Sequence, residues 1–210
     1  MQRYFVLPEQ ISEQEVLIRG EDVHHLKNVM RAKPGQQLIV CSGQGLDYQA
    51  EVMEIGAQEV RCRILGTSAS RGEPDTKVTI AQSLPKGDKL EWIIQKGTEL
   101  GAVSIIPFIS KRTVVKIDAR KAEKKRERWQ RIAKEAAEQA HRGRIPAVSH
   151  PLSWEKLLEQ MERAEAAFIA YEKGGIPLKQ AILSTKAKNI MLIIGPEGGF
   201  EEGEIAEAKG

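Results

Sequence analysis

Short stretches of alternating apolar and polar residues dominate the first third of the chain, as is typical of half-buried β-strands. The alternation is clearest over residues 46–52 and 60–64, and Gly43-Gln44-Gly45 before them predicts a hairpin turn. One short helix is expected over residues 22–31, where Val23, Leu26 and Met30 share a face. Further strands are expected at residues 3–7, 15–19 and 37–42. Several short strands around one helix predict a small β-barrel.

The pattern changes after a segment rich in Ser, Gly and Pro at residues 67–75, which predicts a linker between two domains, residues 1–72 and 73–210. In the second domain, short apolar runs alternate with helical periodicity, and this order predicts an α/β fold with a parallel sheet covered by helices on both faces. Strands are expected at residues 77–82, 103–109, 166–171 and 189–194, and helices at residues 89–100, 119–141, 154–163 and 178–183.

The composition argues against a membrane span, a signal peptide and a metal site. No apolar run approaches the roughly 20 residues of a membrane span, and the opening MQRYF lacks the apolar core of a signal peptide, so a cytoplasmic protein without a membrane is expected. Cys41 and Cys62 lie on predicted strands and are expected to be small buried side chains. The four His and two Cys show no metal-ligand spacing, so no metal is predicted.

Positive charge is concentrated in one block. Thirteen Lys and Arg against five Asp and Glu between Lys111 and Arg144 give a local charge of +8, which leaves −5 for the rest of a chain whose total is +3. Such a block indicates a polyanionic partner. A solvated helix face with ion pairs one turn apart explains the block equally well, and both interpretations stay open.

The sequence IGPEGGF follows the predicted strand at residues 189–194 and precedes a predicted helix. Ligands of open α/β sheets bind at the carboxyl ends of strands, and glycines let the backbone approach a ligand closely. A phosphate loop would end in Lys-Ser or Lys-Thr, whereas this loop has no Lys and carries Glu197. A neutral or cationic ligand with an adenine or ribose to hydrogen-bond fits better, although a plain tight turn is the alternative.

These motifs resemble one family. Besides IGPEGGF, the motifs that carry the resemblance are RYF, HHLKNVMRAKPG, KGDKLEWIIQKGTELG, IIPFISKRTVVK and RWQRIAKEAAEQAHRGRIP. IGPEGGF resembles the cofactor loop of the SPOUT class of S-adenosylmethionine-dependent RNA methyltransferases, and with the other motifs the whole chain is similar to its RsmE family of 16S ribosomal RNA uridine-N3 methyltransferases. The resemblance implies a PUA-like RNA-binding barrel, a trefoil-knotted methyltransferase domain, a homodimer, and 16S rRNA of the small ribosomal subunit as the substrate.

Candidate site residues follow from the motifs and from the resemblance. Arg112 and Arg142 are the candidate catalytic cations that would favour the anion of uracil. The expected S-adenosylmethionine site comprises Tyr171, Glu172, Ile194, Gly195, Pro196, Glu197, Gly198, Gly199 and Phe200. The expected RNA contacts are Arg3, His25, Arg31, Lys33, Lys111, Arg112, Glu138, Gln139 and Arg142.

Two rival hypotheses remain: a catalytically inert RNA-binding or ribosome-assembly protein, and a nucleotide-binding enzyme, which the absence of Lys from the glycine loop disfavours. An inert binder has no need of a site for S-adenosylmethionine, so binding of this cofactor discriminates between the hypotheses.

In the family, a later segment containing L-G-x-R-I-L-R-x-E-T-A completes the cofactor pocket, and this sequence, which stops at Gly210, does not contain it. Either the natural protein continues beyond Gly210 or it is a damaged relative. We expect the first, with weaker cofactor binding by a chain ending at Gly210 than by one about 40 residues longer.

Overall fold

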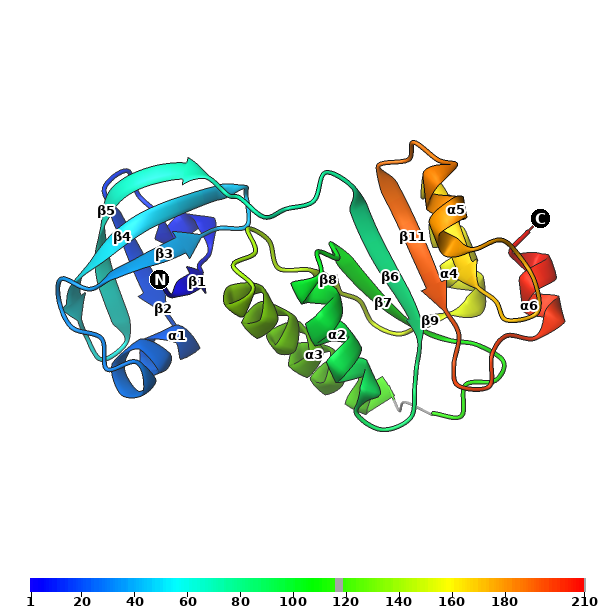
Figure 1. Cartoon of the computed structure of the whole chain (residues 1–210). Coiled ribbons are helices and arrows are strands. Elements are labelled where there is room, and N and C mark those ends of the chain that lie inside the picture. Colours follow the sequence, from blue (N-terminus) through cyan, green and yellow to red (C-terminus); the bar gives the residue numbers. More distant parts are fainter. Residues whose placement is uncertain (116–118, 210) are drawn as a thin grey trace. The chain divides into compact units, whose positions relative to one another are not determined.

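The computed structural model describes residues 1–115 and 119–209 (Figure 1), so Lys116, which ends one of the family-like motifs, and Gly210 lie outside the described residues. Contacts divide the chain into two compact units. The first comprises Met1–Glu73 and Ala137–Ile145, and the second comprises Pro74–Ala136 and Pro146–Gly210. The short segment Ala137–Ile145 therefore groups with residues that precede it by more than sixty positions.

The first unit is built on a five-stranded sheet in the order β1-β3-β4-β5-β2. β1 pairs with β3 in parallel, and the other neighbours are antiparallel. The alternating positions of the sequence supply its core, in which Val52, Val60 and Cys62 are almost fully buried. The elements are β1 (Arg3–Phe5), β2 (Glu15–Arg19), β3 (Gln37–Cys41), β4 (Leu46–Ile55) and β5 (Glu59–Ala69), with a 3-10 helix at Pro8–Gln10 and α1 at Glu21–His24.

The expected single helix over residues 22–31 is replaced by two shorter pieces. α1 continues directly into a π-helix at His25–Val29, and Arg31 takes a left-handed conformation with φ of 49° that stops further helix. The wider π turn is stabilised by its contact with the barrel, because the Nδ1 atom of His25 lies 3.0 Å from the hydroxyl of the buried Tyr4.

Both cysteines are buried and unpaired by disulfide, which confirms the interpretation of their sequence context. Burial raises the pKa of each thiol to about 11. Both thiols are therefore neutral and poorly nucleophilic near neutral pH.

The second unit is a parallel sheet in the order β10-β11-β6-β7-β8, with β9 also pairing with β7. Every pairing in it is parallel, as predicted. The strands are β6 (Lys77–Ser83), β7 (Ser104–Ile109), β8 (Ala147–Val148), β9 (Leu152–Ser153), β10 (Ala166–Ala170) and β11 (Asn189–Ile194). The helices are α2 (Lys89–Glu99), α3 (Ala119–Gln139), α4 (Trp154–Met161), α5 (Leu178–Leu183) and α6 (Glu202–Glu207).

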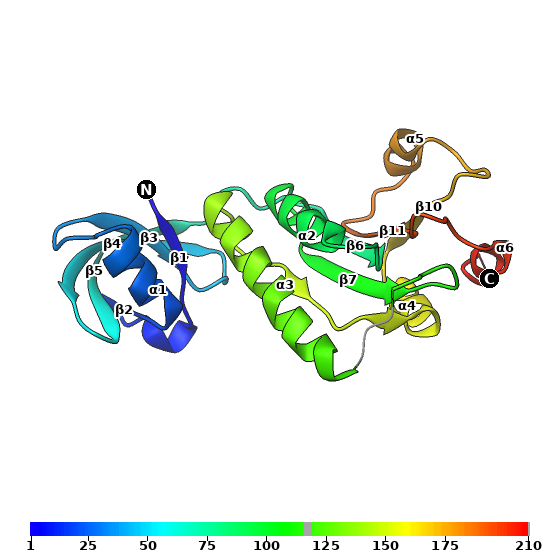
Figure 2. The same ribbon diagram turned by 90° about the horizontal axis from the view of Figure 1, so that it is seen from below.

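Helices cover both faces of this sheet, as the alternating pattern predicted (Figure 2). α2 approaches one face closely at Gly97, where an added Cβ would lie 2.9 Å from Ile80 Cδ1 and 3.7 Å from Ile105 Cδ1. α4 and α6 pack on the other face, where their side chains share a core with Phe108, Ile193 and Phe200. The trefoil knot implied by the resemblance stays a prediction.

Candidate functional site

The carboxyl ends of β10, β11, β6 and β7 meet at one edge of the parallel sheet, because parallel strands in register end on the same side. Four connecting segments leave the sheet there: residues 171–177, 195–201, 84–88 and 110–115. This is the edge at which open α/β sheets bind ligands, and residues singled out in the sequence converge on it.

Tight packing explains two of the three glycines in IGPEGGF. A Cβ added at Gly195 would lie 2.9 Å from the ring of Phe200, and Phe200 is fully buried against Phe108 and Trp154. Gly199 has φ of 70°, and a Cβ there would lie 2.8 Å from the carboxylate of Glu172. The glycines thus allow the loop to pass close to a ring on one side and a carboxylate on the other.

Glu197 is fixed by contacts with the segment that follows β6. Its Oε1 atom accepts a hydrogen bond of 2.7 Å from Lys89 Nζ and one of 3.3 Å from the backbone N–H of Lys86. The hydrogen bond from Lys89, with help from backbone N–H groups, lowers the pKa of Glu197 to about 2. Glu197 is therefore ionised near neutral pH, and its charge is paired with that of Lys89.

The turn after β7 brings Lys111 and Arg112 to the same edge. Arg112 Nη1 donates a hydrogen bond of 2.8 Å to the carbonyl oxygen of Gly198 in the glycine loop. Beneath the turn, the hydroxyl of Ser83 lies 3.1 Å from that of Ser110 and 2.9 Å from that of Thr113. Both cationic side chains remain partly exposed, so they can reach a ligand while their backbone is held.

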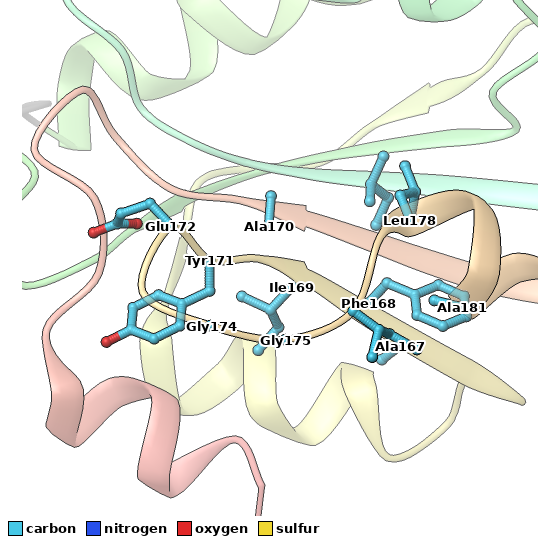
Figure 3. A pocket seen from close by; sticks show the side chains of 12 residues that line it. Ala167, Phe168, Ile169, Ala170, Tyr171, Glu172, Gly174, Gly175, Leu178 and Ala181 are labelled. Atoms are coloured by element: carbon cyan, nitrogen blue, oxygen red, sulfur yellow. The ribbon is translucent and has the colours of Figure 1, made fainter.

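A cavity of about 580 Å³ opens beside β10, on the segment that follows this strand. Figure 3 shows Tyr171 and Glu172 at one end of it and Phe168 and Leu178 at the other. The glycine loop does not itself line the cavity, but Glu172 links the two, since its carboxylate lies against Gly199. The combination of apolar walls with a carboxylate and a phenol at one end suits a ligand that is partly apolar and partly cationic.

The structure brings together the residues of the expected cofactor site with Lys111 and Arg112, all in the second unit. The other expected RNA contacts belong to the first unit. Of these, Arg31, Lys33 and Gln139 are exposed, and His25 is half-buried against Tyr4.

Three residues of the expected RNA surface make structural contacts within the first unit. Arg3 is buried and makes a two-pronged ion pair with Asp47. Arg142 is 2% exposed and donates hydrogen bonds of 2.8 and 2.7 Å to the two carboxylate oxygens of Glu73. Glu138 accepts a hydrogen bond from the backbone N–H of Phe5. These environments fit a role in holding the unit together better than contact with RNA or with a reacting base.

Sequence reasoning missed three buried polar residues at the site: Gln82, Ser83 and Glu204. Gln82 Nε2 donates to the carbonyl oxygen of Gly195 at 3.2 Å. Ser83 anchors the turn after β7, and Glu204 is fully buried behind the glycine loop. The Glu201–Glu204 spacing at a helix start carries a detectable signal, because an acceptor at the third helical position commonly binds the N–H that precedes the helix. Gln82 and Ser83 carried no such signal.

No group of three or more His, Cys, Asp or Glu side chains within residues 1–115 and 119–209 is arranged to hold a metal ion. Across the same ranges, no helix combines the length and the apolar character needed to cross a bilayer.

Family models match most of the chain. Residues 72–210 match an RNA methyltransferase domain, and residues 18–65 match an RNA methyltransferase PUA domain. The chain is 46% identical over 214 residues to ribosomal RNA small subunit methyltransferase E of Bacillus subtilis, covering 98% of this chain and 84% of that protein. It is 36% identical over 209 residues to the protein of the same name from Synechocystis, covering 98% and 67%.

Solved structures resemble the chain over nearly its whole length. A crystal structure described as a hypothetical protein superposes with a TM-score of 0.89 at 45% identity, covering 99% of this chain and 86% of that one. The ribosomal RNA small subunit methyltransferase E of Neisseria gonorrhoeae, solved bound to S-adenosyl methionine, superposes with a TM-score of 0.88 at 29% identity, covering 100% and 85%.

Proposed function

The chain belongs to the RNA methyltransferase family, and from that premise we propose that it transfers a methyl group from S-adenosylmethionine to N3 of a uridine in 16S ribosomal RNA. The observation that carries the proposal is the glycine loop, which lies at the carboxyl end of β11, on the ligand-binding edge of the sheet, and packs against Glu172 at the end of the cavity. A catalytically inert RNA-binding protein, the alternative, finds no support among the relatives described above.

The residues of this edge fit S-adenosylmethionine. The cofactor has a sulfonium cation, an adenine and a ribose, and the edge offers the carboxylate of Glu172 and the apolar cavity beside β10, next to a loop whose own carboxylate, Glu197, is paired with Lys89. Gly195 and Gly199 stand where side chains would collide with Phe200 and Glu172, so these glycines let the loop pack against both residues and bring it next to the carboxylate at the end of the cavity. We infer that Tyr171, Glu172 and residues 194–200 hold the cofactor, which supplies an electrophilic methyl group when bound.

N3 of uridine is a poor nucleophile until it loses its proton. Each unit by which the pKa of the N3–H group exceeds the pH adds about 1.4 kcal/mol to the cost of removing that proton. Arg112 is the cation best placed to favour the uracil anion, because its guanidinium donates to Gly198 of the glycine loop and, although it lies 3.9 Å from Glu201, its side chain stays 42% exposed. N3 lies on the pairing edge of the base, so the uridine must be unpaired or turned out of its stack to reach this site. Arg142 is not carried into the mechanism, since its guanidinium is committed to Glu73.

The sequence left two interpretations of the basic block open, a helix face with ion pairs and a surface for a polyanionic partner. Different residues of the block fit each of them. Arg126 pairs with Glu123 one turn away on the same helix, as an ion-paired helix face requires, whereas Arg128 pairs with Glu91 of α2. Lys124 and Lys125 lie exposed on the same helix, α3. We propose that these two lysines contact RNA phosphates together with Lys111 and Arg112.

Replacing Lys124 and Lys125 with glutamine should weaken binding to 16S RNA and lower the magnitude of the slope of log affinity against log salt by about one to two, since each phosphate contact contributes roughly 0.7 to 0.9. The measurement is a salt titration of RNA affinity by fluorescence anisotropy. The matched control replaces Lys186 and Lys188, two exposed lysines near the opposite edge of the same sheet, with glutamine. An equal loss of slope in both double variants would contradict a specific role of α3.

We further propose that the protein acts in the cytoplasm as a homodimer without a metal. The resemblance to the family supports the dimer, and two-fold pairing is the commonest form of oligomer. Methyl transfer from labelled cofactor to small ribosomal subunits that lack the modification tests the proposed activity directly.

A further inference from the structure

Glu204 is the one acidic residue of α6 that lies fully buried, and its carboxylate joins two separate segments of the site. Its Oε2 atom accepts a hydrogen bond of 2.9 Å from the backbone N–H of Glu201, directly after the glycine loop. Its Oε1 atom accepts a hydrogen bond of 2.9 Å from the backbone N–H of Lys111, in the turn after β7. Burying a carboxylate is costly unless its oxygens are satisfied, and here two backbone donors from different segments satisfy them.

The second of these bonds is not needed to cap the helix. A glutamate at the third helical position commonly binds the N–H of the residue that precedes the helix, and the bond to Glu201 is of that kind. The bond to Lys111 spans 93 positions in the sequence and reaches the segment that carries the two exposed cations of the site.

Other contacts fix the same turn from different directions. The hydroxyl of Thr113 binds Ser83 and also accepts a hydrogen bond of 2.8 Å from the backbone N–H of Ser110. Above the turn, Arg112 donates to the carbonyl oxygen of Gly198. The turn is thus held by the hydroxyls of Ser83 and Thr113 and by the carboxylate of Glu204. In this position the guanidinium of Arg112 can donate its hydrogen bond to the glycine loop.

We propose that Glu204 is a positioning residue: it holds the turn that carries Lys111 and Arg112 in register with the glycine loop, so that the RNA-facing cation and the cofactor loop keep one fixed geometry. The inference rests on the proposed function for the meaning of that geometry, but the hydrogen bonds themselves do not depend on it. Glu204 acts through Arg112, because its two carboxylate oxygens are bound to the backbone N–H groups of Lys111 and Glu201.

A role limited to capping α6 makes a different prediction. A cap stabilises the helix whether or not Arg112 is present, so its loss would lower activity by the same factor in the parent protein and in an Arg112→Ala background. A residue that acts by positioning Arg112 loses its effect once the guanidinium is gone. A double-mutant cycle separates the two cases.

The test measures kcat/KM for methyl transfer to small subunits in full-length protein with Glu204→Gln, Arg112→Ala and both changes. Glutamine keeps the shape but turns an amide N–H₂ towards one of the two backbone donors, so one hydrogen bond is lost. We expect about a ten-fold loss from Glu204→Gln alone and less than a two-fold further loss in the Arg112→Ala background. Equal factors in both backgrounds would overturn the proposal.

The matched control is Glu202→Gln, which removes the same charge from an exposed residue of α6 and should leave kcat/KM within two-fold of the parent. Thr113→Val loosens the turn from below and should show the same dependence on Arg112, which keeps the proposal testable if Glu204→Gln fails to fold. Hydrogen exchange at the Lys111 amide gives a readout independent of activity. It should accelerate about ten-fold in Glu204→Ala, which removes both acceptor oxygens, and stay unchanged in Glu202→Ala. Unchanged exchange in Glu204→Ala contradicts the positioning role, whereas absence of methyl transfer by the parent contradicts the proposed function.

Discussion

Replacing Gly195 with alanine should weaken binding of S-adenosylhomocysteine about ten-fold or more, because the new Cβ would lie 2.9 to 3.3 Å from three atoms of the Phe200 ring. Phe200 is fully buried among Phe108 and Trp154 and has no room to move. The loop must shift instead, and overpacking of this kind costs about 1–3 kcal/mol. A shift of the loop changes the backbone groups and the carboxylate of Glu197 that we assign to the cofactor. Isothermal calorimetry with S-adenosylhomocysteine measures the effect.

Gly198→Ala is the matched control for this prediction. The nearest atoms to a Cβ at Gly198 are Arg112 Cβ at 3.6 Å and Cδ at 3.7 Å, which is ordinary van der Waals contact. The loop can therefore keep its path, and the melting temperature should stay near that of the parent. If Gly195→Ala binds S-adenosylhomocysteine as tightly as the parent does, the loop is not the cofactor site that we propose.

Replacing Arg142 with alanine should destabilise the first unit by about 3 kcal/mol, the lower end for breaking a buried ion pair, because Glu73 keeps a quarter of its side chain exposed. The change removes two hydrogen bonds to Glu73 and leaves this carboxylate with one of 3.0 Å from the backbone N–H of Gly143. At roughly 2–4 °C per kcal/mol for a chain of this size, the melting temperature should fall by about 6–12 °C. The salt dependence of RNA affinity should not change, since the guanidinium is buried.

The pH dependence provides a second readout of the same pair. Burial alone raises the pKa of Glu73, but the hydrogen bonds and the charge of Arg142 outweigh burial, so the pKa lies below its ordinary value of 4.5. A carboxylate with a lowered pKa contributes stability that is present above the unfolded pKa and is lost as the pH falls through the folded pKa. The stability difference between the parent and Arg142→Ala should therefore shrink as the pH falls below 4.5.

Arg144→Ala is the control, because Arg144 lies two positions away and is exposed. It should change the melting temperature by no more than about 2 °C. If Arg142→Ala showed a salt-dependent loss of RNA affinity with no loss of stability, Arg142 would be an RNA contact. That result would contradict our conclusion that its role is to stabilise the first unit through Glu73.

The sequence predicted the parts of this protein that depend on local pattern. The alternation around Val52 and Val60 identified the strands of the first unit, and the order of apolar runs identified the parallel sheet of the second. The place of IGPEGGF after a strand located this loop at the carboxyl edge of the sheet, because the end of a parallel strand can be located without knowing its neighbours.

Features that depend on long-range partners were not predictable from local pattern. Arg142 belongs to a basic block, and only the approach of Glu73, 69 positions earlier, turns it into a buried structural residue. Arg3 is committed to Asp47 in the same way. The short strands β8 and β9, of two residues each, leave too brief a pattern for periodicity to detect, and they are defined only by pairing with β7.

Glu204 illustrates the same limit within the site. Its spacing from Glu201 indicates a helix cap, which any acidic residue at that position could provide. Its contact with Lys111 follows only from the way β7 and β11 flank β6 and bring both connecting segments to one edge.

The most direct test of the proposed activity is transfer of a labelled methyl group from S-adenosylmethionine to small ribosomal subunits that lack the modification, followed by nucleoside analysis of the 16S rRNA. We expect the label in N3-methyluridine of the 16S rRNA when the subunits are incubated with the parent protein. With Gly195→Ala, the same nucleoside should carry much less label. Absence of label from the RNA, or label confined to a nucleoside other than N3-methyluridine, would contradict it.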